Sequence, residues 1–197
     1  GLIDGDGGFY LNESGVVSFE LTLDSKDEAT LYFIKNILGY GNVDKRTGVN
    51  AHRLRTAETS CVLDLLKRVN GKLLTIDKQT QLRNVCSHYN IPCIIPSLLD
   101  SLSIIRNTAW LSGFFDAEGS LIIFNEVTLV MSIPQKNNAI LELIGKALTA
   151  ERGRINSDRS YGGWVYRVMN REGIRLILHR FTIHKLFTTA RPSAKAR

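Results

Sequence analysis

The chain has 197 residues and a mass of 22.0 kDa, which is enough for one large domain or two small ones. A hydrophobic fraction of 44% and a charged fraction of 22% are typical of a globular protein, and no apolar run is long enough to cross a membrane. The net charge of +6 and the pI near 9.3 favour a polyanionic partner over an acidic small molecule.

Residues 1–90 alternate strand and helix patterns after a short N-terminal motif. Residues 9–24 alternate apolar and polar side chains around a turn at 12–15, which predicts a hairpin with one polar face. Glycines and capping residues bound the later elements. After the hairpin we expect a helix that starts at Ser25 or Asp27 and buries Leu31, Ile34, Ile37 and Leu38, strands 43–46 and 52–56, and a helix over 59–70 that buries Leu63, Leu66 and Val69. The segment 72–78 should then lead into a last helix that reaches about Tyr89.

Residues 91–107 are expected to form a linker, because Pro92 and Pro96 interrupt the helical pattern. The segment is rich in Ile and Leu, so it should lie against the body of the protein. Beyond it the same order of elements returns. The second half should contain a motif at 113–119, a strand over 127–133 after a tight turn at Asn125, a helix carrying Ile140 to Leu148, strands near 152–156 and 164–170, a helix carrying Ile174 to Phe181, and a segment 184–191 that mirrors 71–78.

The motif occurs twice, as Gly-Leu-Ile-Asp-Gly-Asp-Gly over residues 1–7 and as Gly-Phe-Phe-Asp-Ala-Glu-Gly over residues 113–119. Because the elements after it also recur, at a separation close to half the chain, the sequence is a tandem duplication. We therefore expect an α+β fold of two pseudo-twofold αββαββα halves, residues 1–90 and 108–197. Each half would hold a four-stranded antiparallel sheet, and a central pair of motif helices would join them. The first motif has no lead-in segment like 107–112, so we expect residues to precede Gly1.

Each motif places an acid, Asp6 or Glu118, directly after the second of two small residues spaced four apart. Such spacing lets two helix backbones approach closely. If the motif helices pair through these faces, Asp6 and Glu118 meet, and two carboxylates about 6 Å apart repel by roughly 3 kcal/mol. The helix C-termini add negative charge, which a divalent cation would relieve. A single copy would favour a core helix with an exposed acid, but two copies in register favour a metal site. Asp4 and Asp116 are expected to support the helices.

The polar faces of the predicted sheets suit a nucleic acid. Antiparallel sheets can keep one face in water, and the side chains here are of types that contact phosphates and base edges. Strands of about nine residues span roughly 30 Å, so two sheets would cover roughly 18 to 20 base pairs. A solvated face without a ligand is the alternative. The side chains expected on these faces are Ser18, Glu20, Thr22, Arg46, Arg53, Arg55, Thr128, Ser132, Arg154, Arg159 and Arg167.

The two motifs and the repeated order of elements resemble the single-chain LAGLIDADG homing endonucleases over essentially the whole sequence. The resemblance implies that the motif helices lie at the centre and that both sheets lie along the major groove of DNA. It implies that Asp6 and Glu118 bind the catalytic metal, with the backbone carbonyls of Gly5 and Ala117 as further ligands. The implied cofactor is Mg²⁺, and Mn²⁺ or Ca²⁺ could occupy the same site.

The resemblance also assigns three accessory residues. Lys78 and Arg191 match the family's basic position near each scissile phosphate, and Gln135 matches a polar residue that orders water. The alternatives are ordinary surface charges for Lys78 and Arg191 and a helix-capping neighbour for Gln135. The first half has Ser25 where we place Gln135 in the second half, and Arg191 cannot lose a proton as a lysine can.

These features together predict a monomeric, metal-dependent DNA endonuclease that recognises a long asymmetric duplex and hydrolyses one phosphodiester on each strand. The alternatives are an intron-encoded RNA maturase that binds its host intron RNA, and a nucleic-acid-binding protein that does not cleave. Cys61, Cys86 and Cys93 lack metal-ligand spacing, so we expect them in the core of a protein from a reducing intracellular compartment. The family resemblance implies the mitochondrion or the chloroplast as the location of such a protein. The four histidines share no ligand spacing.

Overall fold

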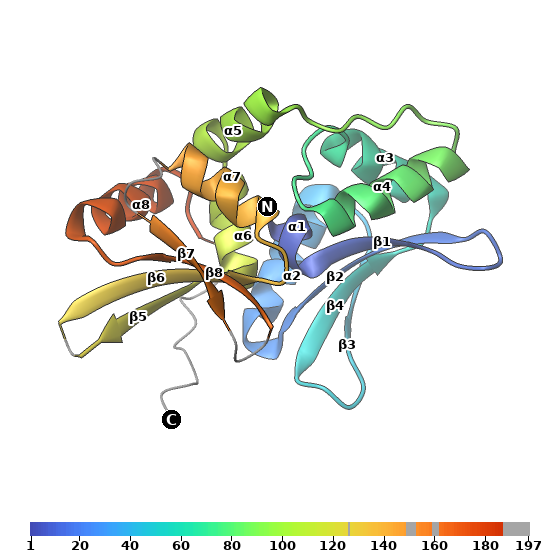
Figure 1. Cartoon of the computed structure of the whole chain (residues 1–197). Helices are drawn as coiled ribbons and strands as arrows, with labels where there is room; N and C mark the ends of the chain where they lie inside the picture. Colours follow the sequence, from blue (N-terminus) through green and yellow to red (C-terminus); the bar gives the residue numbers. More distant parts are fainter. Residues whose placement is uncertain (126, 149–152, 159–161, 187–197) are drawn as a thin grey trace. The chain divides into compact units, whose positions relative to one another are not determined.

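The structure is a computed structural model, and it describes residues 1–125, 127–148, 153–158 and 162–186 (Figure 1). The chain forms two compact units. The N-terminal unit contains Ile3–Pro96, and the C-terminal unit contains Ser97–Arg197 together with Gly1–Leu2. The boundary between Pro96 and Ser97 falls within the predicted linker. No helix in the described ranges is long and apolar enough to span a bilayer.

The N-terminal unit has one antiparallel sheet with the strand order β1-β2-β4-β3. The sequence predicted the order of helices and strands along this half of the chain, and the structure confirms it. A short 3₁₀ turn, Ser25–Asp27, links the second strand to the following helix. The elements are α1 (Leu2–Asp6), β1 (Gly7–Leu11), β2 (Val17–Asp24), α2 (Glu28–Leu38), β3 (Asn42–Lys45), β4 (Ala51–Thr56), α3 (Thr59–Val69) and α4 (Ile76–His88).

Alternation along β2 and β4 buries one face of this sheet against helices of the same unit. Leu21, Leu23 and Leu54 are nearly inaccessible, whereas the residues between them are partly exposed. The predicted helix stripes were less accurate. On α3 the buried positions are Cys61, Val62, Leu65, Leu66 and Val69, so Leu63 falls at the edge of the stripe and is only half-buried. On α2 only Thr30 and Leu31 are buried, and Ile37 is 61% exposed.

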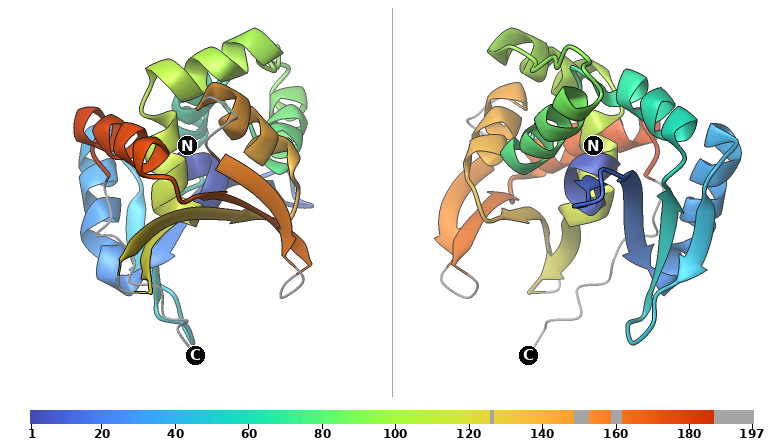
Figure 2. Two further views of the ribbon diagram at one scale, coloured as in Figure 1. Left: turned by 60° about the vertical axis from the view of Figure 1, so that its left-hand side comes forward. Right: turned by 90° about the vertical axis from the view of Figure 1, so that its right-hand side faces the viewer.

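The C-terminal unit repeats this topology, with the strand order β5-β6-β8-β7. Figure 2 shows α7 and α8, in orange and red, on one face of its sheet. Buried residues on that side include Met131, Ile133 and Tyr166. The elements are α5 (Leu98–Asn107), α6 (Trp110–Glu118), β5 (Ser120–Phe124), β6 (Thr128–Gln135), α7 (Ala139–Ala147), β7 (Gly153–Asp158), β8 (Gly163–Val168) and α8 (Arg171–Ile183).

Helix α5 corrects the prediction of a linker over residues 91–107. Ser97 accepts a hydrogen bond from Asp100 N at 3.2 Å, and the Asp100 carboxylate accepts one from Ser97 N, which forms a capping box. The two prolines concealed this helix start, because they precede it. The remaining segment, 91–97, does lie against its unit as expected: Asn70 donates to Pro92 O and accepts from Ile94 N, both at 2.8 Å.

Two arginines join the helices of the C-terminal unit at their C-terminal ends. Arg106, near the end of α5, donates to Lys146 O and Ala147 O at the end of α7. Arg180 on α8 donates to Ile105 O at 3.2 Å and to Arg106 O at 2.6 Å. The guanidinium groups thus meet the partial negative charge of two helix ends. Burial and the neighbouring Arg106 lower the pKa of Arg180.

Candidate functional site

Each motif acid is the last residue of its helix, Asp6 in α1 and Glu118 in α6, and both side chains are half-buried. A glycine follows each acid and leads into a strand. The backbone of Gly119 is extended, with φ −82° and ψ 161°, so this position does not require the left-handed conformation that favours glycine. Its role is steric: a Cβ at Gly119 would overlap the Phe115 ring, and a Cβ at Gly7 would lie 2.9 Å from Ile3 Cα.

The small residues of the motifs permit a close backbone approach inside the C-terminal unit, which includes Gly1 and Leu2. A Cβ at Gly113 would lie 2.7 Å from Leu2 N, and one at Gly1 would overlap the Trp110 carbonyl. The predicted use of Gly1 and Gly113 is therefore confirmed. Asp6 belongs to the N-terminal unit and Glu118 to the C-terminal unit. The pairing of Asp6 with Glu118, and the roles of Gly5 and Ala117, remain predictions.

Asp4 joins the first motif helix to the start of α4. Its Oδ1 accepts hydrogen bonds from Leu74 N at 2.8 Å, Thr75 N at 2.9 Å and Thr75 Oγ1 at 3.1 Å, and the side chain is buried. Thr75 is the N-cap residue of α4, and Lys78 lies in the first turn of that helix. The expected supporting role of Asp4 therefore acts on the segment that carries Lys78.

The accessory residues have different settings. Lys78 is half-buried on α4, and Gln135 is half-buried as the last residue of β6, opposite Trp164. Arg191 and Arg159 lie outside the described residues. The strand register corrects the equivalence of Ser25 and Gln135. Gly8 and Ser120 are each the second residue after a motif acid, and they pair with Glu20 and Ser132 respectively, so Glu20 and Ser132 are equivalent. Counting three residues on from each shows that Gln135 corresponds to Leu23, a buried apolar residue.

We call the sheet surface opposite the helices of the same unit its open face. In the N-terminal unit this face carries Glu20 and Thr22 on β2 and Arg53 and Arg55 on β4, since each alternates with a buried leucine. Ser18 shares the alternation but is 6% exposed, so its predicted contact with a nucleic acid is not supported. Arg46, which follows β3, is exposed.

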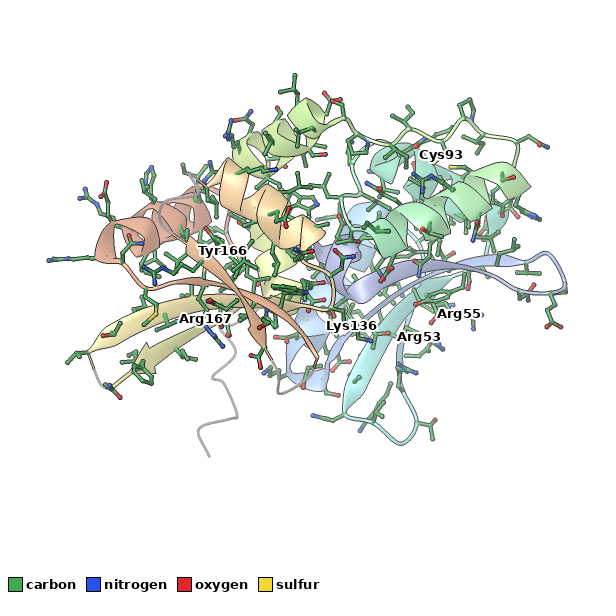
Figure 3. The ribbon with its side chains drawn as sticks, in the orientation of Figure 1. Arg53, Arg55, Cys93, Lys136, Tyr166 and Arg167 are labelled. Atoms are coloured by element: carbon green, nitrogen blue, oxygen red, sulfur yellow. The ribbon has the colours of Figure 1, made fainter. Side chains whose placement is uncertain are left out.

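The Glu20 carboxylate contacts both arginines of this face. Figure 3 labels these arginines, Arg53 and Arg55, on the N-terminal sheet. Its Oε2 lies 3.1 Å from Arg53 Nη1, and its Oε1 lies 3.2 Å from Arg55 Nε. Arg55 is directly opposite Glu20 in the register, and Arg53 is opposite Thr22. The three side chains form one network rather than three separate groups.

On the C-terminal open face, a row of polar residues crosses the four strands. Ser120 pairs with Ser132, Ser132 with Arg167, and Arg167 with Arg154. The two serine hydroxyls are 2.8 Å apart, and Arg167 Nη2 lies 3.5 Å from Asp158 Oδ2. Thr128, at the start of β6, is half-buried.

The prediction of open-face residues missed Asn42, Asp44, Ser120 and Asp158. Asn42 lies opposite Arg55, and Asp44 lies opposite Arg53. Alternation along β3 and β7, together with the position of Ser120 two residues after Glu118, could have identified them. Acids on this face matter because they offset the charge that nearby arginines present to a polyanion.

The positions of the cysteines and histidines do not favour a catalytic thiol or a metal site built from these residues. Cys61, Cys86 and Cys93 are free thiols, and the first two are buried as predicted. Burial, with a smaller effect of the Cys93 thiol, raises the pKa of Cys86 to about 11, so it is a poor nucleophile near neutral pH. In the described part of the chain, no three His, Cys, Asp or Glu side chains gather as a metal site.

Comparisons with known proteins point to one family. Residues 1–89 match the LAGLIDADG endonuclease family. The chain is 30% identical over 95% of its length to the probable intron-encoded endonuclease 4 of Neurospora crassa, and 35% identical over 61% of its length to the intron-encoded RNA maturase bI4 of Saccharomyces cerevisiae. It spans 36% and 18% of these relatives, which are much longer proteins.

Solved structures show the same fold. The LAGLIDADG homing endonuclease I-LtrWI, in a structure bound to target DNA, aligns with a TM-score of 0.70 and 18% identity. The alignment covers 95% of this chain and 83% of that one.

Proposed function

The chain belongs to the LAGLIDADG endonuclease family, and from this premise we propose that it is a site-specific, metal-dependent endonuclease that cleaves both strands of duplex DNA. The observation that carries the proposal is the matched setting of the two motif acids. Asp6 and Glu118 each end a motif helix, and a glycine leads from each into the first strand of a four-stranded sheet. A duplicated acid in a duplicated setting suits a reaction on two antiparallel DNA strands.

The residues around these acids fit a hard divalent cation. Carboxylate and carbonyl oxygens are the ligands that Mg²⁺ prefers, and each motif offers one acid together with a helix C-terminal carbonyl, from Gly5 or Ala117. We propose that Asp6, Glu118 and these two carbonyls hold Mg²⁺, for which Mn²⁺ or Ca²⁺ could substitute. When bound, the cation would supply an activated water and stabilise the charge that develops on the phosphate.

The chain's own side chains would complete the reaction. Lys78 lies in the first turn of α4, whose N-cap residue Thr75 is bonded by Asp4, and it would donate to the phosphate oxygens and stabilise the transition state. Arg191 would do so on the other strand. Gln135 would orient the attacking water, and the buried Leu23 at the corresponding position cannot, so we propose that the two strands are cut at unequal rates.

The open faces would recognise the target. Both present arginines and small polar side chains, which contact phosphates and base edges in the major groove. We propose that a single chain binds as a monomer, because the repeat supplies both halves of the interface. The free thiols suit a reducing compartment, and mitochondrial location remains a proposal.

The relative named as an RNA maturase supports a second candidate, binding of the host intron RNA. We place the nuclease first because both motif acids are present in this chain. A maturase that no longer cuts DNA could lose either acid without loss of activity.

The test is to select a cleavage target from a randomised plasmid library with Mg²⁺ and then to compare acid variants. Asp6→Asn and Glu118→Gln should each lower double-strand cleavage at least 100-fold, while binding in Ca²⁺ is retained or strengthened, because one carboxylate fewer faces the phosphates. Glu142→Gln is the matched control, an exposed acid on α7 whose partner is Asn138. Full double-strand cleavage by either motif variant would overturn the joint metal site.

A further inference from the structure

The Glu20 network gives its two arginines unequal freedom. Both carboxylate oxygens of Glu20 are engaged, one by each arginine. The side chain of Glu20 is 22% exposed, that of Arg53 27% and that of Arg55 47%. Since each oxygen lies within ion-pair distance of a guanidinium, the charge of Glu20 is largely compensated by its two neighbours. Its geometry suits the orientation of these neighbours.

Arg55 keeps its best recognition edge available. It uses Nε to reach Glu20, so its two terminal nitrogens remain available as a planar pair. A pair of guanidinium N–H groups matches the O6 and N7 acceptors of guanine in the major groove. The ion pair on the Nε side restricts the motion of the guanidinium, which lowers the entropy lost when it pairs with a guanine.

Arg53 is engaged the other way round. It reaches Glu20 with a terminal nitrogen, Nη1, and its Nε is buried without a hydrogen-bond partner among the described residues. Of the Arg53 nitrogens that could form a bidentate contact with a base, Nη1 is thus occupied by Glu20 and Nε is inaccessible. Arg53 also lies opposite Asp44, whereas Arg55 lies opposite the neutral Asn42.

We propose that Arg55 is the guanine-reading residue of the N-terminal open face and that Glu20 is its positioning residue. Arg53 supplies positive charge toward the phosphates and reads no base. This assignment rests on the proposed function and deepens it, because it names the base and the side chain that discriminates it. It also refines the prediction that Glu20, Arg53 and Arg55 lie on the face that binds DNA.

The experiment uses the full chain and the duplex target that the wild-type protein selects from a randomised library. Binding is measured in Ca²⁺ against the target and against single-base-pair substitutions at every position. Arg55→Ala should lower discrimination about 10- to 100-fold at one G·C pair and little elsewhere. Arg55→Lys should lose the same discrimination with a smaller loss of affinity, because it keeps the charge but not the fork. Arg53→Ala should weaken binding to all sequences alike.

Glu20→Gln is the decisive variant. It should reduce discrimination at the pair assigned to Arg55 at least threefold and strengthen binding to unrelated duplex, since an acid is removed from the face. In the Arg55→Ala background the same change should have no further effect at that pair. Asp158→Asn is the matched control, because it removes an acid beside Arg167 on the other sheet and should leave the Arg55 pair unchanged.

The outcomes separate this assignment from the proposed function. A protein that selects its target and loses the G·C preference in Arg53→Ala but not in Arg55→Ala would overturn the assignment alone. So would a folded Glu20→Gln protein, judged by its thermal unfolding, that keeps full discrimination. If Glu20→Gln does not fold, Arg55→Lys decides, and its retention of the preference would refute the assignment. A wild-type protein that selects no sequence would refute the proposed function, and this assignment with it.

Discussion

The two sheets share one topology but differ in the charge of their open faces. In the N-terminal sheet Glu20 stands at the position that Ser132 occupies in the C-terminal sheet, as their pairing with Gly8 and Ser120 establishes. The acid contacts two arginines, whereas in the described part of the chain the Ser132 hydroxyl bonds only that of Ser120. One fold thus presents two open faces with different arrangements of charge: Glu20 bridges two arginines on one, whereas Asp158 faces Arg167 on the other.

The units also differ in how each motif helix is fastened to its surroundings. In the N-terminal unit the Asp4 carboxylate accepts two backbone N–H groups and a hydroxyl from Leu74 and Thr75. In the C-terminal unit the Ser112 hydroxyl donates to His184 O at 2.6 Å. Hydrogen bonds to a charged acceptor are stronger than those between neutral groups. The contrast therefore predicts unequal dependence on a single side chain.

Asp4→Leu should produce the largest loss of stability, about 3 kcal/mol, because it leaves the buried amides of Leu74 and Thr75 without their acceptor. Ser112→Ala should cost only about 1 kcal/mol. Urea unfolding followed by far-UV circular dichroism measures both, and hydrogen exchange at the Leu74 and Thr75 amides localises the first.

Asp4→Asn is the control, because an amide oxygen can still accept at the Oδ1 position while the charge is lost. It should cost less than half as much as Asp4→Leu. Equal losses for Asp4→Leu and Ser112→Ala would contradict the claim that the carboxylate makes the stronger fastening.

The order of elements was predictable from the sequence because it depends on local periodicity. The hairpin over 9–24 and the helix over 59–69 follow from alternation and from a 3.6-residue repeat, and each is bounded by turn residues. Helix α5 was missed because Pro92 and Pro96 dominated the interpretation of a segment whose capping box, Ser97 with Asp100, lies just beyond them.

The candidate site was predictable in its residue types but not in its contacts. A repeated acid after paired small residues singles out Asp6 and Glu118 as candidates, and their joint role stays a prediction. Cross-strand register, however, decides that Glu20 meets Arg55 and that Gln135 corresponds to Leu23 rather than Ser25. Register depends on long-range pairing, which periodicity within one strand does not encode. For the same reason, alternation alone placed Ser18 on an accessible surface.

The cores of the two sheets offer a second comparison, at Tyr166 and its counterpart Leu54. Tyr166 pairs with Ile133 and Leu54 with Leu21, the residues that follow Ser132 and Glu20. A glycine lies beside each: a Cβ at Gly41 would lie 2.9 Å from Leu54 Cδ1, and a Cβ at Gly153 would overlap the Tyr166 ring and hydroxyl. The larger side chain of Tyr166 thus depends on the missing Cβ.

Gly153→Ala should destabilise the C-terminal unit by about 1–3 kcal/mol, the usual cost of overpacking a core. Adding Tyr166→Leu, which copies the arrangement of the other sheet, should recover part of that loss, so the two changes should be non-additive by about 1 kcal/mol. Both tryptophans, Trp110 and Trp164, lie in this unit, so urea unfolding followed by their fluorescence reports on it directly. Additive losses in the double variant would show that the ring and residue 153 do not compete for space.

The smallest expected effect concerns the Tyr166 hydroxyl, which has no counterpart on Leu54. Tyr166 is 1% exposed, and its hydroxyl has no hydrogen-bond partner among the described residues. Tyr166→Phe should therefore leave stability at pH 7 unchanged or raise it by up to about 1 kcal/mol, because an unbonded buried hydroxyl is unfavourable.

The Tyr166 hydroxyl should also make the stability of the wild type depend on pH in a way that the stability of Tyr166→Phe does not. Burial raises the pKa of Tyr166 above its usual value near 10, so the folded protein holds this proton more tightly than the unfolded chain does. The stabilisation that results is fully present below pH 10 and is lost as the pH rises toward the folded-state pKa. Unfolding curves of the wild type and Tyr166→Phe, measured by tryptophan fluorescence between pH 8 and about 11, should diverge above pH 10, with the wild type losing more stability. A constant difference across that range would mean that Tyr166 titrates no differently in the folded and unfolded states, and a loss of stability in Tyr166→Phe at pH 7 would mean that its hydroxyl is bonded after all.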